Sequence, residues 1–171
     1  GADFGAREIY VANHTGNSVS IIDTATNAVL ATVPVGNGPR SPVANSGLGK
    51  VYVPNYNDAS VSVIDTLTRA VTKTIPVGSG PQYAAVDADH DKVYVNNVAD
   101  RTISVIDSAT DSVIKTLPSG AGSDDNFGNV NHAYGRYYLA NSVDNTVTIV
   151  DTDTDTVAGT VTVGTKPIQI Q

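Results

Sequence analysis

Cysteine, methionine and tryptophan are all absent from this chain of 171 residues. The lack of cysteine excludes disulfides, thiolate metal sites and thiol catalysis. No apolar run approaches the roughly 18 residues that a membrane-spanning helix needs, so we expect no membrane insertion. Because no methionine stands at position 1, we expect the sequence to be either a processed chain or an excerpt.

Positive charge is also scarce. Ten Lys and Arg stand against 17 Asp and Glu, which gives a formal net charge of −7 and a pI near 4.6. The basic residues are scattered, so the composition argues against a nucleic-acid or anionic-membrane partner. The chain is rich in Thr, Asn, Asp and Ser, which together with the missing residue types predicts an extracellular, cell-surface or periplasmic location.

What the chain has instead is a short motif that recurs four times. Its copies lie at 10–13 (YVAN), 52–55 (YVPN), 94–97 (YVNN) and 138–141 (YLAN), so they are 42, 42 and 44 residues apart. Each leads into a second apolar segment that ends in aspartate, at 19–23, 61–65, 103–107 and 147–151. A fixed period of this length indicates stacked structural units that bury their apolar faces against one another.

Within each unit the apolar residues alternate with a period of two, which predicts strands. The alternation assigns one face of the second unit to Val51, Val53, Val61 and Val63 and the other to Tyr52, Ser62 and Ile64. The repeated Asp begins a tight turn, and glycine-rich connections follow at 36–39, 78–81, 120–122 and 164–167. Four antiparallel strands per unit predict an all-β fold, a β-propeller of four-stranded blades.

The chain is expected to be a single domain, 1–171, with repeats at about 9–50, 51–92, 93–136 and 137–171 plus 1–8. The segment 167–171 starts an innermost strand, and 1–8 supplies the rest of one. Three closures fit this pattern. They are a four-bladed ring closed by its own ends, an eight-bladed ring of two chains, and part of a longer array.

The Tyr-Val-x-Asn, Val-Ser-Val-Ile-Asp-Thr and Ile-Pro-Val-Gly-x-Gly-Pro elements resemble the YVTN-repeat β-propellers, found in archaeal surface-layer proteins and exported bacterial proteins. The resemblance covers nearly the whole chain and brings no catalytic motif. Members of that family usually have about seven blades, whereas four repeats are present here. The resemblance implies a surface or exported protein that binds partners or assembles.

Candidate functional residues are sought where the repeats differ, because positions alike in all units are explained by turns and caps. Asn13, Asn55, Asn97, Asn141 and the four repeated aspartates are therefore interpreted as structural. The variable loops are expected on one face, where binding sites gather. The candidate binding residues there are His14, Arg40, Tyr56, Gln82, Tyr83, Arg101, Asp124, Asp125 and Asn126.

The longest of these loops offers oxygen ligands of the kind calcium uses, at Asp124, Asp125 and Asn126. Calcium is the candidate ion, and no other cofactor is predicted. His90 is expected at the face opposite His14, so a site of all three histidines is not expected. The sequence predicts a binding or structural module whose partners are proteins, surface polymers or another copy of itself. The alternative is a small lyase-type or hydrolase-type enzyme with its site at the channel mouth.

Overall fold

The computed structural model describes residues 2–3, 7–122 and 126–170, which form four antiparallel sheets of four strands each. Blade 1 contains β1 (Ala2–Asp3), β2 (Glu8–Asn13), β3 (Ser18–Asp23) and β4 (Val29–Pro34). Blade 2 contains β5 (Val43–Asn45), β6 (Lys50–Asn55), β7 (Ser60–Asp65) and β8 (Ala70–Pro76). Blade 3 contains β9 (Pro81–Asp87), β10 (Lys92–Asn97), β11 (Thr102–Asp107) and β12 (Ser112–Pro118). Blade 4 contains β13 (Gly128–Asn131), the 3-10 turn η1 (His132–Tyr134), β14 (Arg136–Asn141), β15 (Thr146–Asp151) and β16 (Thr156–Thr162).

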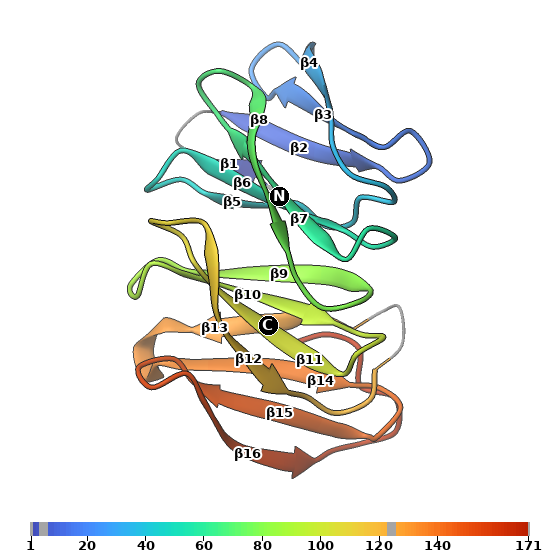
Figure 1. The fold of residues 1–171 in the computed structure, drawn as a ribbon, viewed down its shortest axis with the longest axis vertical. Coiled ribbons are helices and arrows are strands. Elements are labelled where there is room, and N and C mark those ends of the chain that lie inside the picture. Colours follow the sequence, from blue (N-terminus) through green and yellow to red (C-terminus); the bar gives the residue numbers. More distant parts are fainter. Residues whose placement is uncertain (1, 4–6, 123–125, 171) are drawn as a thin grey trace.

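The strands of each blade pair in chain order, which confirms the all-β propeller prediction. Figure 1 shows the blades in sequence along the long axis of the molecule, with blade 1 and blade 4 at opposite ends. The four blades therefore form an open row rather than a ring closed on itself. In the described part of the chain, no helix is long and apolar enough to cross a membrane.

The predicted faces of blade 2 are wrong in one respect. In the antiparallel register Val51 lies opposite Ile64, and Tyr52 lies opposite Val63. Residues directly opposite each other share a face of the sheet, so Val51 shares its face with Ile64 and Tyr52 shares its face with Val63. Alternation gives the period within each strand, but the register between strands decides which residues lie together.

Each blade thus has two apolar faces, which we name by direction along the chain. The leading face contacts the preceding blade, and the trailing face contacts the next one. The trailing face of blade 2 contains Tyr52, Val61, Val63 and Ile75, which pack on Ala84, Val93, Val95 and Ile106 of blade 3. The three apolar clusters of the described residues correspond to the three junctions between consecutive blades. No blade has a core of its own.

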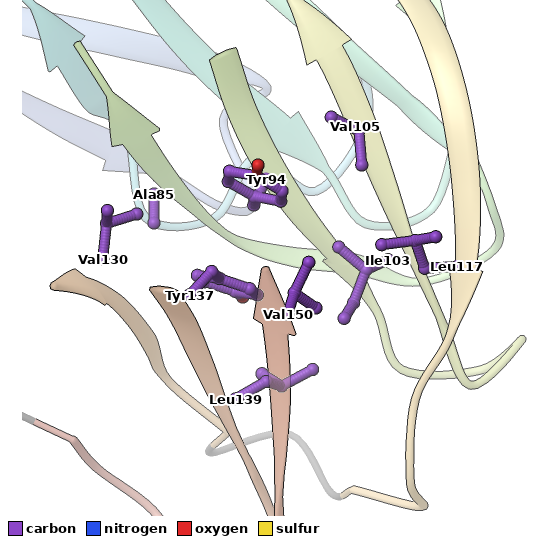
Figure 2. Packing of buried hydrophobic residues seen from close by; sticks show 9 residues of the cluster. All are labelled: Ala85, Tyr94, Ile103, Val105, Leu117, Val130, Tyr137, Leu139 and Val150. Carbon is purple, nitrogen blue, oxygen red and sulfur yellow. The ribbon is translucent and has the colours of Figure 1, made fainter. Parts of the chain in front are cut away.

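Figure 2 shows the junction between blades 3 and 4, where Tyr94 lies over Tyr137. Their ring centroids are 4.9 Å apart and the planes are inclined by 12°, a stacked pair. Both side chains are fully buried. The residues labelled in the figure are Ala85, Tyr94, Ile103, Val105, Leu117, Val130, Tyr137, Leu139 and Val150.

A polar contact accompanies each apolar junction. Asp111 of blade 3 accepts hydrogen bonds from Lys50 Nζ at 2.8 Å and from the Tyr52 hydroxyl at 2.7 Å, both in blade 2. Burial, together with the hydrogen bond to Asp111, raises the pKa of Tyr52. The aspartate thereby pairs with a partly buried cation and with a phenol that the apolar junction encloses.

The same arrangement recurs at the third junction, between blades 3 and 4. At the first junction, between blades 1 and 2, the acidic and basic partners exchange blades. Asp155 of blade 4 lies 2.9 Å from Lys92 Nζ and accepts from the Tyr94 hydroxyl at 2.9 Å. At the first junction the acid belongs to the earlier blade, because Glu8 accepts from Arg69 at 2.7 Å. The last residue of the turn between the third and fourth strands, namely Arg69, Asp111 or Asp155, therefore carries the partner in each of the three described junctions.

The repeated Asn and Asp residues are structural, as predicted. Asn55 Nδ2 donates to Ser60 Oγ at 3.0 Å and to Ser62 Oγ at 2.9 Å, and Asn13, Asn97 and Asn141 make equivalent pairs of bonds. Asp107 Oδ1 accepts from the backbone N–H of Thr110 at 2.8 Å. Such backbone hydrogen bonds hold the pKa of Asp23, Asp65, Asp107 and Asp151 below the ordinary value.

Three of the repeated Asn residues, Asn55, Asn97 and Asn141, also pack on a glycine of the preceding connection. A Cβ at Gly78 would lie 2.7 Å from Asn97 Nδ2, and one at Gly36 would lie 2.6 Å from Asn55 Nδ2. Gly120 meets Asn141 in the same way. Only glycine allows this approach, so each connection is held against the blade that follows it.

Candidate functional site

The variable loops gather on one face, as predicted. The backbone N–H of Tyr56, in the turn after β6, donates to the carbonyl of Gly38 at 3.0 Å. The next N–H, of Asn57, donates to the carbonyl of Asn37 at 3.1 Å. The turn between second and third strands therefore lies against the connection that enters the same blade. We call the surface formed by these turns and connections the variable-loop face.

Three of the predicted binding residues meet on this face between blades 1 and 2. The guanidinium carbon of Arg40 lies 5.0 Å from the centre of the Tyr56 ring, in cation–π geometry. His14 Nδ1, from blade 1, lies 3.4 Å from the carbonyl oxygen of Pro39. The residues come from the two turns and the intervening connection, so the fold brings together side chains that are far apart in the sequence.

Arg40, Gln82 and Asn126 occupy equivalent positions in three successive blades. Each stands three residues before the residue that pairs with the repeated tyrosine, namely Val43, Ala85 and Asn129. The register therefore puts Asn126 at this position in blade 4. The corresponding place after blade 4 holds Ile168, which is apolar and 45% exposed.

These three polar side chains have atoms without partners. Gln82 is 6% exposed and Asn126 is 2% exposed, yet Gln82 Oε1 and Asn126 Oδ1 accept no hydrogen bond from any described residue. Arg40 Nε is likewise buried without an acceptor. A buried polar atom left unpaired costs about 1–3 kcal/mol. The Oδ1 atoms of the repeated Asn55, Asn97 and Asn141 are unpaired in the same way, so such atoms also occur at structural positions of this fold. The three atoms of Arg40, Gln82 and Asn126 belong to three different blades, and each offers a polar ligand one hydrogen bond.

The other predicted residues lie apart from this group. Tyr83 packs edge-on against Phe127, with ring centroids 5.1 Å apart, beside the third junction. Burial raises the pKa of the Tyr83 phenol. Arg101 is exposed in the turn between β10 and β11, with a positive φ of 55°. Asp124 and Asp125 lie outside the described residues, so the calcium site remains a prediction.

The second candidate site is the pair of end faces, the leading face of blade 1 and the trailing face of blade 4. The sequence indicated only that the two chain ends are sites of association. On the leading face of blade 1, Ile9 is 36% exposed and Val11 is 42% exposed. The equivalent Val51 and Val53 of blade 2 are fully buried. The end face of blade 1 thus presents the same apolar strand that buries itself at an internal junction.

The trailing face of blade 4 is open in the same way. Val161 is 49% exposed, whereas Ile75, at the equivalent position in blade 2, is 2% exposed. A hollow of about 450 Å³ lies on this side of blade 4, lined by Asn129, Val130, Asn131, His132, Tyr138 and Ile170. Beside it, the backbone N–H of Phe127 donates to the carbonyl of Ile168 at 2.9 Å.

The structure is similar to solved propeller proteins. Hydrazine synthase of Kuenenia stuttgartiensis superposes with a TM-score of 0.84 at 22% identity, over 94% of this chain and 47% of that one. Dihydro-heme d1 dehydrogenase NirN in complex with DHE superposes with a TM-score of 0.72 at 17% identity, over 99% of this chain and 35% of that one. No protein family and none of the curated proteins matches the chain.

These similarities show the fold. The chain is a β-propeller protein built of four blades, and it spans less than half the length of the two solved chains. The resemblance to the YVTN repeats is not tested by them and stays a prediction.

Proposed function

We propose that the chain is an extracellular structural and binding module whose two end faces pair with a second copy of itself. Two copies joined at both ends would form an eight-bladed ring. The observation that carries this proposal is that each exposed end face is the counterpart of a face that is buried at every internal junction. The variable-loop face then serves as the ligand-binding surface of the assembly.

Apolar complementarity supports the pairing. The leading face of blade 1 offers Ile9, Val11 and Ile22, and the trailing face of blade 4 offers Tyr138, Val147, Ile149 and Val161. Their equivalents at the second junction are Val93, Val95 and Ile106 on one side and Tyr52, Val61, Val63 and Ile75 on the other. The two ends therefore repeat the chemistry of an internal junction, and an exposed apolar face of this kind marks an association surface.

The glycine–asparagine contact supports the same geometry. Gly164 follows blade 4 as Gly36, Gly78 and Gly120 follow the other blades, but a Cβ there would meet no atom within 4 Å. Asn13 is the repeated Asn of blade 1, and no connection precedes it among the described residues. An end-to-end contact would bring Asn13 of one copy against Gly164 of the other.

The polar contacts of such a junction are also compatible. Arg136 and Tyr138 stand where Lys92 and Tyr94 stand in blade 3, and Asn27 of blade 1 stands where Asp155 stands in blade 4. Across a junction between two copies, the side-chain Oδ1 of Asn27 would accept from the guanidinium and from the phenol, and no like charges would be opposed. One contact of the internal junctions would be missing between two copies. Inside the chain, an acid such as Asp100 accepts from the backbone of the preceding connection, here from Ser79 N–H at 2.7 Å. In blade 1 the equivalent position is Gly16, which has no side chain to accept such a bond.

The binding role rests on the unpartnered atoms of Arg40, Gln82 and Asn126. A ligand with both hydroxyl groups and acceptor oxygens, such as a surface polysaccharide, matches their chemistry. His14, the candidate base of an enzymatic site, lies against the backbone carbonyl of Pro39, which favours a positioning role over a catalytic one.

The experiment is the mass of the full chain in solution, measured by light scattering over a range of concentrations. We expect twice the chain mass, reverting to the single mass in Val11→Asp and in Val161→Asp. The matched control is Leu67→Asp, because Leu67 is 88% exposed in a turn outside both end faces. A single-chain mass at every concentration would overturn the proposal, as would equal effects of the end-face and control variants.

A further inference from the structure

Two histidines and three aspartates converge on the face opposite the variable loops, between blades 3 and 4. β9 ends at Asp87, the turn that follows contributes Asp89 and His90, η1 contributes His132, and the turn between β15 and β16 contributes Asp153. Asp87 is 1% exposed, and its Oδ2 lies 2.9 Å from His90 Nδ1. Its other oxygen, Oδ1, lies 3.7 Å from His132 Nδ1. Asp89 Oδ2 approaches the same His132 nitrogen at 3.1 Å.

We propose that Asp87, Asp89 and His132 bind a divalent transition-metal ion of the zinc class. One ligand atom from each residue lies within 4.8 Å of the others. Zinc bonds to imidazole nitrogen and carboxylate oxygen are about 2.0–2.2 Å long, so a small inward movement of the three atoms completes the site. Asp89 and His132 are on turns with side chains 62% and 48% exposed, so that movement is available to them.

The donor set selects the ion. One imidazole with two carboxylates suits zinc, cobalt or nickel, whereas calcium takes six to eight oxygen ligands and no nitrogen. A site with three protein ligands leaves a fourth position for water. Since the chain has no cysteine, no thiolate competes for such an ion elsewhere.

His90 serves this site as a positioning residue rather than as a ligand. Its Nδ1 faces Asp87, and its Nε2 lies 2.7 Å from Asp153 Oδ1 in the turn of blade 4. Both nitrogens of His90 therefore face a carboxylate oxygen, one in blade 3 and one in blade 4. Outer partners of this kind fix the orientation of a ligating carboxylate.

Two of the three ligands occupy positions that the propeller scaffold does not require. Position 87 holds Asp or Asn in every blade, as Asp3, Asn45 and Asn131, and Asp87 Oδ1 also accepts the backbone N–H of Asp89 at 3.2 Å, so this residue serves the turn as well. Position 89, in contrast, is Gly47 in blade 2 and Ala133 in blade 4. The place of His132 is taken by Ser46 and Ala88 in the other two turns. Among the described turns of this kind, the combination therefore arises at one junction, although the same turn is built three times.

Charge around the site favours a cation. Asp87, Asp89 and Asp153 gather there, whereas the nearby Lys92 is directed to Asp155 Oδ2 at 2.9 Å and to the Thr152 carbonyl at 2.7 Å. An ion bound at this place would connect the inner turn of blade 3 with η1 of blade 4. It would stabilise that junction in proportion to its affinity for the folded chain.

The test is calorimetric titration of the full chain with zinc chloride at neutral pH. We expect one ion per chain, and cobalt in its place should give the visible absorption bands of a four-coordinate centre. His132→Asn and Asp89→Asn should each weaken zinc binding at least about tenfold. His14→Asn is the matched control, because it removes a histidine from the opposite face, and it should leave the affinity unchanged.

Both ligand variants replace half-exposed side chains, and circular dichroism would confirm that they fold. Three outcomes would overturn the proposal. They are no heat of zinc binding, an equal loss of affinity in His14→Asn and His132→Asn, and calcium binding that is tighter than zinc binding and insensitive to His132→Asn.

Discussion

The internal junctions and the end faces are built from the same side chains but differ in what covers them. Ile106, on the leading face of blade 3, is fully buried, whereas Ile22, at the equivalent position of blade 1, is partly exposed. The register, the turn and the strand partners are the same in both blades. The difference shows that the apolar side chains of a blade are buried only where another blade packs on them. Each apolar core is therefore formed by two neighbouring blades.

The largest expected effect is a core truncation made at both places. Ile106→Ala should lower the free energy of unfolding by about 3 kcal/mol, because it opens a cavity in a closed junction. Ile22→Ala should lower it by about 1 kcal/mol or less in the single chain, measured by denaturant unfolding at low concentration. If the two losses were equal, the distinction between junction and end face would be wrong.

A smaller effect is expected from the polar partner of the junction. Asp111→Ala removes the acceptor of Lys50 and Tyr52 and should cost about 2 kcal/mol, since hydrogen bonds to charged groups contribute about 1.5–3 kcal/mol each. Asn27→Ala is the matched change on blade 1, and both positions have a positive φ, 52° and 58°. The backbone penalty cancels in the comparison, so the difference between the two unfolding free energies measures the junction contact alone. No difference would contradict the assignment.

The smallest effect is a gain in stability. Gln82→Ile introduces the residue that stands at the equivalent place after blade 4, Ile168, and removes a buried amide whose oxygen has no partner. We expect the free energy of unfolding to rise by about 1 kcal/mol, measured by thermal or denaturant unfolding. Such a gain would mean that the amide is retained for binding rather than for stability, and a loss would mean that it is paired within the fold.

The sequence was sufficient for the repeat, the strands and the structural roles of Asn55 and Asp107, because these depend on local hydrogen bonds and a fixed period. It also placed the variable loops on one face. It did not give the pairing of Tyr52 with Val63, since alternation does not contain the register between strands. The open row of blades could not be predicted from the sequence either, because all three closures leave the same local sequence pattern.

The candidate sites were less predictable because they depend on residues from different repeats. Arg40 and Tyr56 were each chosen as variable, but their contact follows from the turn and the connection packing together. Asp87 and His132 are 45 positions apart and were not considered together. Aligning the three inner turns residue by residue would have shown that the third and fourth repeats carry Asp and His where the second carries Asn and Ser.

The junction contacts described above all join consecutive blades, and this has a consequence for folding. No blade has to wait for a distant part of the chain, so a nucleus can form at any of the three junctions and spread outward. Blades 1 and 4 each have one packed neighbour, and their amide hydrogens should exchange sooner than those of blades 2 and 3. Ring closure would abolish this gradient, since every blade would then open only with the whole molecule.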